Sequence, residues 1–388
     1  MKIITTLLLL STIIFAENFE QFLSKALETS PYLKSSALNI EQVSIEGSIL
    51  SRYKNPKLQV EYSSFEPDLG PSKNGYRLNY SQPIRLWSVG EDKNALTQAN
   101  IKNADASYMQ KRARFIRKLS LLYSNYSQSK KLLALGKQEL SIAKKIYDIS
   151  LARFEGGSIH EGLKLQAQVD FEMVESLQEK LFLSSTNTYF NLLSFAGVNE
   201  EIELQENYDF SLKNDFSSTQ NPSITLYKAQ KNRALKEEKL NSNKIEWINL
   251  FTELENEPSQ DILRLGVTIP LAIFNDKSEE KSIANLEATQ AELLIENENS
   301  RLNMKLLRLQ KERLSLFKLN EQSKKILKTQ EKLLKMYEDA YKIANISLLQ
   351  LQDIKNKLIQ TRRQIIQTDT ALNQNAIYTN YNQGSYNE

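Results

Sequence analysis

The sequence contains few side chains whose type and spacing would support catalysis or metal binding. Its single histidine, His160, is followed by Glu161, and one imidazole beside one carboxylate does not supply the ligands of a metal site. The carboxylate pairs Glu237–Glu238 and Glu279–Glu280 lie in helical charge patterns, where a solvated face explains them. No phosphate-binding glycine loop, nucleophile elbow or His-Glu-x-x-His segment occurs. We therefore expect no enzyme activity, no metal and no cofactor.

The elements that position the side chains come in two copies of one plan: helix, β-hairpin, very long helix, tight turn and returning helix. The first repeat covers residues 17–195 and the second covers 222–372, with a linker over 196–221. Landmark residues recur at an offset of 191 before the hairpin tips and 187 after them: Pro31 and Pro222, Glu66 and Glu257, Pro83 and Pro270, Phe154 and Tyr341. A deletion at the tip of the second hairpin explains the change, since deletions in a repeat mark surface loops.

The elements within each repeat follow from periodicity and turn residues. The first repeat is expected to have strands at about 57–66 and 75–87, a long helix at about 91–153, a tip at 154–159 and a returning helix at about 160–195. The second is expected to have strands at about 247–256 and 262–272, a long helix at about 276–343, a tip at 344–347 and a returning helix at about 348–372. Residues 373–388, rich in Asn and Tyr, are expected to form a loose tail or an external strap.

The strands alternate between apolar and polar residues. In the return strand of the first repeat, Tyr76, Leu78 and Tyr80 share one face, and Arg77 and Asn79 share the other. Each strand has about 10 residues, the length that a tilted strand needs to cross a membrane. A soluble hairpin with one buried face would show the same alternation. Four strands are too few to close a barrel, so we expect the chain to share its sheet with other copies of itself.

Residues 1–16 have the pattern of a secretory signal peptide, with Lys2 before an uncharged run and Ala16 as a suitable last residue before cleavage. The run is shorter than the roughly 20 apolar residues of a transmembrane helix. We therefore expect an exported protein. Because it has no cysteine, its stability must come from packing, oligomerisation or membrane insertion. The 50 basic and 47 acidic residues are scattered, so nucleic-acid binding is not expected.

Together these features resemble the outer-membrane efflux family of TolC-like channel proteins, over essentially the whole mature chain. The resemblance is carried by the two repeats, by the strand ends Ser81–Ile84 and Thr268–Leu271, and by the helix-tip segments Arg153–Ile159 and Tyr337–Ser347. It implies a mostly α-helical fold with membrane β-structure, in which three chains form a 12-stranded outer-membrane β-barrel on a periplasmic α-helical barrel. It further implies a homotrimer that meets a periplasmic adaptor, an inner-membrane pump and outer-membrane lipid.

The resemblance also places functional residues at the two helix tips. Adaptor docking is implied for Gly156, Gly157 and Ser158 in the first tip and for Ala344, Asn345 and Ile346 in the second. The family usually has glycine where this chain has Ala344, so Asn345 is expected to take the left-handed conformation instead.

Three residues near the second tip are candidates for the pore or its gate. Asp353 would supply a ring of carboxylates that favours cations. The ring would contain three carboxylates instead of six, because Gln350 at the other matching position is neutral. Tyr341 matches a tyrosine that helps to lock the closed tip. The alternatives are that Asp353 is an ordinary solvated residue and that Tyr341 packs along the helical seam.

We expect the chain to be the outer-membrane exit duct of a tripartite efflux system, which passes small molecules or metal ions from pump and adaptor to the outside. A periplasmic coiled-coil adaptor or scaffold, and the exit duct of a type I protein secretion system, remain as alternatives. An adaptor would carry one helical hairpin between β-rich halves, whereas this sequence has two repeats. A scaffold would not need apolar strand faces of membrane length.

Overall fold

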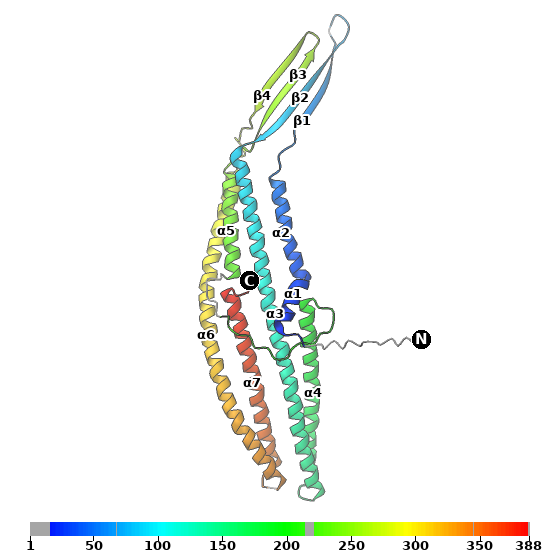
Figure 1. Ribbon diagram of the computed structural model, residues 1–388, viewed down its shortest axis with the longest axis vertical. Coiled ribbons are helices and arrows are strands. Elements are labelled where there is room, and N and C mark those ends of the chain that lie inside the picture. Colours follow the sequence, from blue (N-terminus) through cyan, green and yellow to red (C-terminus); the bar gives the residue numbers. More distant parts are fainter. Residues whose placement is uncertain (1–15, 67, 214–220, 344, 387–388) are drawn as a thin grey trace, which may run out of the picture. The chain divides into compact units, whose positions relative to one another are not determined.

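The computed structural model describes residues 16–66, 68–213, 221–343 and 345–386 (Figure 1). The expected signal peptide, apart from Ala16, lies outside the described residues. The chain divides into two compact units. The first unit comprises Met1–Lys34, Arg112–Asn221 and Leu302–Glu388, and the second unit comprises Ser35–Lys111 and Pro222–Arg301.

The described residues form helices and strands in the predicted order. The helices are α1 (Phe19–Thr29), α2 (Pro31–Leu50), α3 (Trp87–Glu155), α4 (Glu161–Ala196), α5 (Pro222–Asn241), α6 (Ser278–Lys342) and α7 (Leu348–Gln383). The strands are β1 (Lys57–Phe65), β2 (Lys73–Arg85), β3 (Trp247–Glu257) and β4 (Gln260–Thr268). The mostly helical fold with two helix-hairpin-helix repeats is thus confirmed. At 1.5 Å per residue, α3 and α6 are each about 100 Å long. No helix in the described part of the chain is long and apolar enough to cross a membrane.

The four strands lie side by side in the second unit as one antiparallel sheet, in the order β1-β2-β3-β4 (Figure 1). Paired residues share a face, so the apolar positions of all four strands line up in rows. Two such rows are Leu58, Tyr80, Thr252 and Leu265, and Val60, Leu78, Leu254 and Leu263. The sheet's apolar face remains open within the chain, since Val60 is 69% exposed and Leu265 is 75% exposed.

The opposite face of the sheet carries a charge network that crosses all four strands. Arg77 on β2 bonds to Glu61 on β1 at 3.2 Å and to Glu255 on β3 at 2.5 Å. Arg264 on β4 pairs with Glu253 at 2.5 Å and also with Glu255. Cross-strand pairs of opposite charge stabilise a sheet and favour one register. The charged side chains of the polar face are therefore paired within the chain, whereas the apolar face is exposed.

An aromatic cluster forms the core of the first unit around the linker that follows α4. Phe22 and Tyr123 are fully buried there. The Tyr123 hydroxyl donates to the carbonyl of Gln205 at 2.6 Å, and the Tyr189 hydroxyl donates to the carbonyl of Ile202 at 2.8 Å. The described part of the linker is thus held to α3 and α4 by tyrosines.

The returning helix of the second repeat is longer than predicted, so the expected tail was wrong for most of its length. Instead of ending near residue 372, α7 continues to Gln383 and is capped by Gly384. The Asn side chains that suggested a loop bond to neighbouring backbone. The Asn373 side chain accepts from the amide of Phe210 at 3.1 Å, and Asn380 donates to the carbonyl of Ser211 at 2.9 Å. These bonds offset the low helix propensity of Asn.

We predict that Phe22→Ala lowers the free energy of unfolding by about 3–5 kcal/mol, because it empties a fully buried aromatic site. Denaturant unfolding of the first unit, followed by tyrosine fluorescence, measures this change. The matched control is Tyr32→Ala, which truncates an aromatic ring that is 57% exposed and should cost about 0.5 kcal/mol or less. Equal losses in the two variants would contradict the assigned core.

Candidate functional site

The first tip is a glycine-capped helix end in the first unit. The amide of Ser158 donates to the carbonyl of Arg153 at 2.8 Å, and the amide of Gly157 donates to that of Phe154 at 2.9 Å. This pair of bonds is the Schellman arrangement, which requires a left-handed residue after the helix. Gly157, with φ of 70°, meets that need without a side-chain clash. Gly156, Gly157 and Ser158 are all exposed.

The second tip is closed by a similar bond, from the amide of Asn345 to the carbonyl of Ala340 at 2.9 Å. The expected left-handed Asn345 was wrong, because Lys277 is the one non-glycine residue with positive φ in the described part of the chain. The residue before Asn345, Ala344, lies outside the described residues. Asn345 is exposed, and Ile346 is half-buried.

Tyr341 ties the two tips together instead of standing free at the end of α6. Its side chain is 1% exposed, and its hydroxyl lies 3.0 Å from Ser150 Oγ on α3. Ser150 Oγ donates to the carbonyl of Ile146 at 2.9 Å, so in the bond between the two hydroxyls Tyr341 is the donor and Ser150 the acceptor. Arg153 donates to the Tyr341 carbonyl at 3.0 Å, and its guanidinium stacks 4.6 Å from the ring centroid. The tyrosine therefore links α6 to α3 through three contacts.

The other two gate candidates occupy different environments. Gln350 forms a capping box with Ser347 at the start of α7: the amide of Gln350 donates to Ser347 Oγ at 3.3 Å and Gln350 Oε1 accepts from the Ser347 amide at 2.9 Å. Asp353 is exposed and pairs with Lys357 at 2.7 Å, one helical turn further on. Gln350 thus has a structural role, whereas Asp353 presents a partly neutralised charge to solvent.

Charged side chains are buried further along the same helices. Lys355 on α7 is 1% exposed and bonds to Asp170 on α4 at 2.6 Å. Glu139 on α3 is also buried, with Arg363 at 3.6 Å but no hydrogen bond to its Oε2 atom from any described residue. Burial raises the pKa of the Glu139 carboxyl above its ordinary value, although Lys355 and Arg363 act in the opposite direction. These groups connect α3, α4 and α7 by charge.

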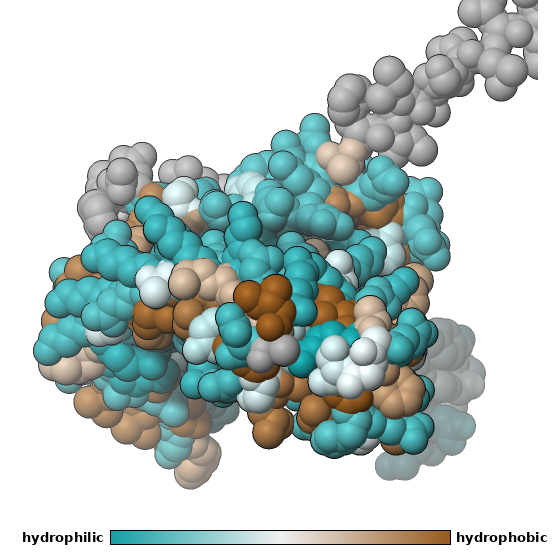
Figure 2. Space-filling view, turned by 90° about the horizontal axis from the view of Figure 1, so that it is seen from below, coloured by the Kyte–Doolittle hydropathy of each residue, from teal (hydrophilic) through white to brown (hydrophobic). Residues whose placement is uncertain are grey.

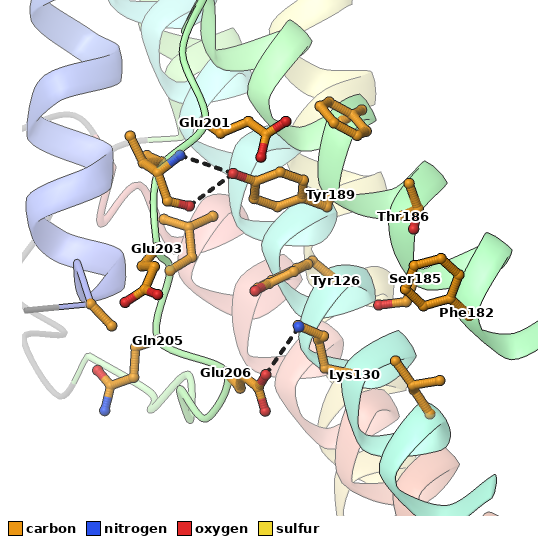
Figure 3. A pocket seen from close by; sticks show the side chains of 15 residues that line it. Tyr126, Lys130, Phe182, Ser185, Thr186, Tyr189, Glu201, Glu203, Gln205 and Glu206 are labelled. Carbon is orange, nitrogen blue, oxygen red and sulfur yellow. Dashed lines mark hydrogen bonds and ion pairs between the residues drawn. The ribbon is translucent and has the colours of Figure 1, made fainter. Parts of the chain in front are cut away.

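A cavity of about 700 Å³ lies between α3, α4 and the linker (Figure 3). Its lining is aromatic and acidic, and comprises Ala16, Tyr126, Lys130, Leu133, Phe182, Ser185, Thr186, Tyr189, Phe190 and the segment Glu201–Glu206. Lys130 pairs with Glu206 at 3.1 Å, and Tyr189 is fixed to Ile202 (Figure 3). Burial, followed by the charge of Glu206, raises the pKa of Tyr126 to about 12. The cavity volume suits a small-molecule ligand.

No group of three or more possible metal ligands occurs among the described residues. In the view from below, hydrophilic side chains cover most of the visible face, and hydrophobic side chains gather between them (Figure 2). Two of the exposed hydrophobic residues near the second tip are Ile343 and Leu349. The face that carries the tips is therefore of mixed polarity.

Solved structures of membrane channels share this architecture. CusC, described as forming a transmembrane channel, is 15% identical with a TM-score of 0.77, over 94% of this chain and 91% of that chain. The Campylobacter jejuni CmeC outer membrane channel is 15% identical with a TM-score of 0.73, over 94% and 85%. The Vibrio cholerae outer membrane protein VceC is 12% identical with a TM-score of 0.76, over 94% and 95%. The chain has the TolC-like channel fold. No family model and no curated protein sequence matches it.

Within the TolC-like fold, the sequence identified the tips but not the residues that hold them. Ser150 and Arg153 were not recognised as partners of Tyr341. Lys355 carried a usable signal, because it follows Leu348 and Leu351 at helical spacing and so falls on the buried seam of α7. The linker residues that line the cavity carried no such sequence signal, because their contact with α3 and α4 joins segments far apart in sequence.

We predict that Glu139→Gln raises the free energy of unfolding at pH 7. Because the folded-state pKa of Glu139 is raised, ionising it costs stability as the pH rises through the window between the ordinary value of 4.5 and the folded value. Glutamine keeps the shape of the protonated carboxyl and avoids that loss. Urea unfolding between pH 4 and 8 should therefore show a gain at neutral pH that shrinks towards pH 4.

The control for this prediction is Glu175→Gln, at an exposed position of α4. It should change the free energy of unfolding by no more than about 0.5 kcal/mol at any pH in the series. A loss of stability in Glu139→Gln at pH 7 would show that attraction to Lys355 and Arg363 outweighs the burial of the carboxylate.

Proposed function

We propose that this chain is the outer-membrane exit duct of a tripartite efflux system and works as a homotrimer. The observation that carries the proposal is the open sheet of the second unit, whose apolar face is uncovered and whose edge strands β1 and β4 have no outer partner among the described residues. Similarity to solved outer-membrane channels supports the same reading. The cargo would be small molecules or metal ions, chosen by the pump.

Outer-membrane lipid is the environment that suits the apolar face. The strands have 9–13 residues, enough to cross the hydrocarbon layer when tilted. In the proposed trimer, three sheets of four strands close into one 12-stranded barrel, which removes every free edge. The charge network of Arg77, Arg264 and their glutamates would then line the water-filled interior. The helices would extend from the barrel into the periplasm.

The internal repeat supplies the register of the strand pair that a single chain lacks. Within the chain, Tyr80 of β2 pairs with Thr252 of β3. The corresponding residues of the other repeat are Val267 on β4 and Val60 on β1, at opposite edges of the sheet. Val267 would therefore pair with Val60 of a neighbouring copy, and Thr268 with Gln59 of that copy. This register keeps all apolar residues on one face.

Helices of the first unit also present surfaces that a neighbouring copy would cover. On α6, Leu307 and Leu314 are exposed seven residues apart. On α4, Val169 and Leu183 are exposed fourteen residues apart, which is two heptads, and their exposed fractions are 53% and 60%. Apolar residues repeated every seven positions form the seam between packed helices. Exposed seams on both outer helices suit a closed ring of helices.

The tips would form the periplasmic end of the duct. Exposed Gly156, Gly157, Ser158 and Asn345 are proposed to contact the adaptor, together with Ile346. Ala344 is proposed to belong to the same docking tip. Tyr341, through Ser150 and Arg153, would hold the second tip against the first in the closed duct. Asp353 would supply one carboxylate per subunit to the narrowest part of the pore, with Gln350 shaping the helix start.

We predict that Gln59→Cys combined with Thr268→Cys gives cross-linked dimers and trimers on denaturing gels after mild oxidation of outer membranes. The natural chain has no cysteine, so any disulfide within the protein must join the introduced cysteines. The two positions lie on opposite edges of one sheet, separated by three strand spacings of about 14 Å in total and by four residues along the strand, which excludes a bond within the chain.

The matched control for the cross-link is Ser63→Cys with Thr268→Cys. Ser63 lies four residues beyond Gln59 on β1, about 13 Å from the proposed contact with Thr268 of the neighbouring copy, so this pair should not cross-link. A monomeric mass in mild detergent, with no cross-linking by either pair, would refute the trimer. Cross-linking by the control pair alone would refute the register.

We predict that Asp353→Asn lowers the cation preference of single channels in planar bilayers, because it removes the carboxylate from each subunit. The reciprocal variant Lys357→Gln should increase that preference, since Lys357 partly neutralises Asp353. Unchanged selectivity and conductance in both variants would remove Asp353 from the pore.

A further inference from the structure

The cavity between α3, α4 and the linker combines two surfaces that recognise different parts of one ligand. Phe182 and Phe190 on α4 are 59% and 47% exposed, which is unusual for rings beside a well-formed core. Tyr126 and Tyr189 add two further aromatic side chains, with the Tyr189 hydroxyl engaged by Ile202 (Figure 3). An apolar body can therefore be covered by aromatic side chains.

The opposite wall is acidic, and its charge is only partly balanced. Lys130 neutralises Glu206 at one end of the cavity. Glu201 lies beside Tyr189 at the other end, and Glu203 follows along the linker (Figure 3). Glu201 and Glu203 are exposed, and neither carboxylate forms an ion pair with another described residue. Aromatic rings and unpaired carboxylates together attract positive charge, the rings through their negative faces.

We propose that this cavity binds a small organic cation with an apolar body. The cationic centre would lie by Glu201 and Glu203, and the apolar body against Phe182 and Phe190. The cavity volume of about 700 Å³ is within the range of small-molecule sites. This site lies within one chain, so it does not depend on the proposed channel function.

Removal of the expected signal peptide would alter the rim without removing the site. Cleavage after Ala16 would leave the nitrogen of Glu17 as an ammonium group. That nitrogen donates to the carbonyl of Glu203 at 2.8 Å, and the amide of Gln205 donates back to Glu17 at 2.9 Å. With this ammonium and Lys130 set against three glutamates, the rim keeps a net negative charge. The mature chain is therefore the form to test.

The test uses tetraphenylphosphonium and tetraphenylborate, which have the same shape and opposite charge. Equilibrium dialysis against the mature full chain in a non-ionic detergent, with a detergent-only blank, measures binding. We expect saturable binding of the phosphonium, and none of the borate. The double variant Glu201→Gln with Glu203→Gln should bind the phosphonium at least about tenfold more weakly, as should Phe182→Ala.

Glu175→Gln, an exposed change on α4 away from the cavity, is the control and should bind as the natural chain does. Three outcomes would overturn the proposal: equal phosphonium affinity in the natural chain and both cavity variants, equal binding of the two probes, or no saturable phosphonium binding. Oligomeric mass, measured on the same sample, tests the proposed channel separately, because the cavity lies in a single chain.

Discussion

The sheet of the second unit satisfies its polar face but leaves its apolar face and both edges open. Arg77 and Arg264 share Glu253 and Glu255, so the charged face is paired across strands within one chain. Among the residues that the structure describes, nothing comparable covers Val60 or its row. A soluble sheet would bury that face on a helix layer or another sheet. In the proposed channel, lipid would cover the apolar face and strands of neighbouring copies would pair with both edges. A sequence that is polar overall can therefore still place one sheet in a membrane.

The first unit differs from the sheet, because its packed interior contains polar and charged side chains. Lys355 is nearly inaccessible, and its bond to Asp170 joins α7 to α4. Removing one partner of such a pair costs more than the pair contributes, because a buried charge is then left alone. Asn375 on α7 donates to the carbonyl of Leu309 on α6 at 3.0 Å. Apolar seams tolerate sliding by one heptad, whereas these directional contacts fix one alignment of the helices.

Periodicity and repetition predicted the elements, because both are local properties of the sequence. The alternation in β2 and the long proline-free runs of α3 and α6 needed no tertiary information. The end of α7 was missed because Asn favours loops in isolation, and only contacts with residues such as Phe210 and Ser211 reverse that preference. The partners of Tyr341 and the cavity were missed for a related reason: each depends on segments that meet only after folding.

The offset between the two repeats changes from odd to even within the sheet, and this change supports the proposed pairing with a second copy of the chain. Before the hairpin tips the landmark offset is 191, an odd number that would match apolar positions of β1 to polar positions of β3. The observed strand pairings give an even offset between β1 and β3 instead. Leu58 pairs with Tyr80 and Leu250 pairs with Val267, and Tyr80 and Val267 are 187 residues apart. Leu58 therefore corresponds to Leu250 at an even offset of 192. Under this relation β1·β2 matches β3·β4, and the proposed pair of β4 with β1 of another chain would be the counterpart of β2·β3.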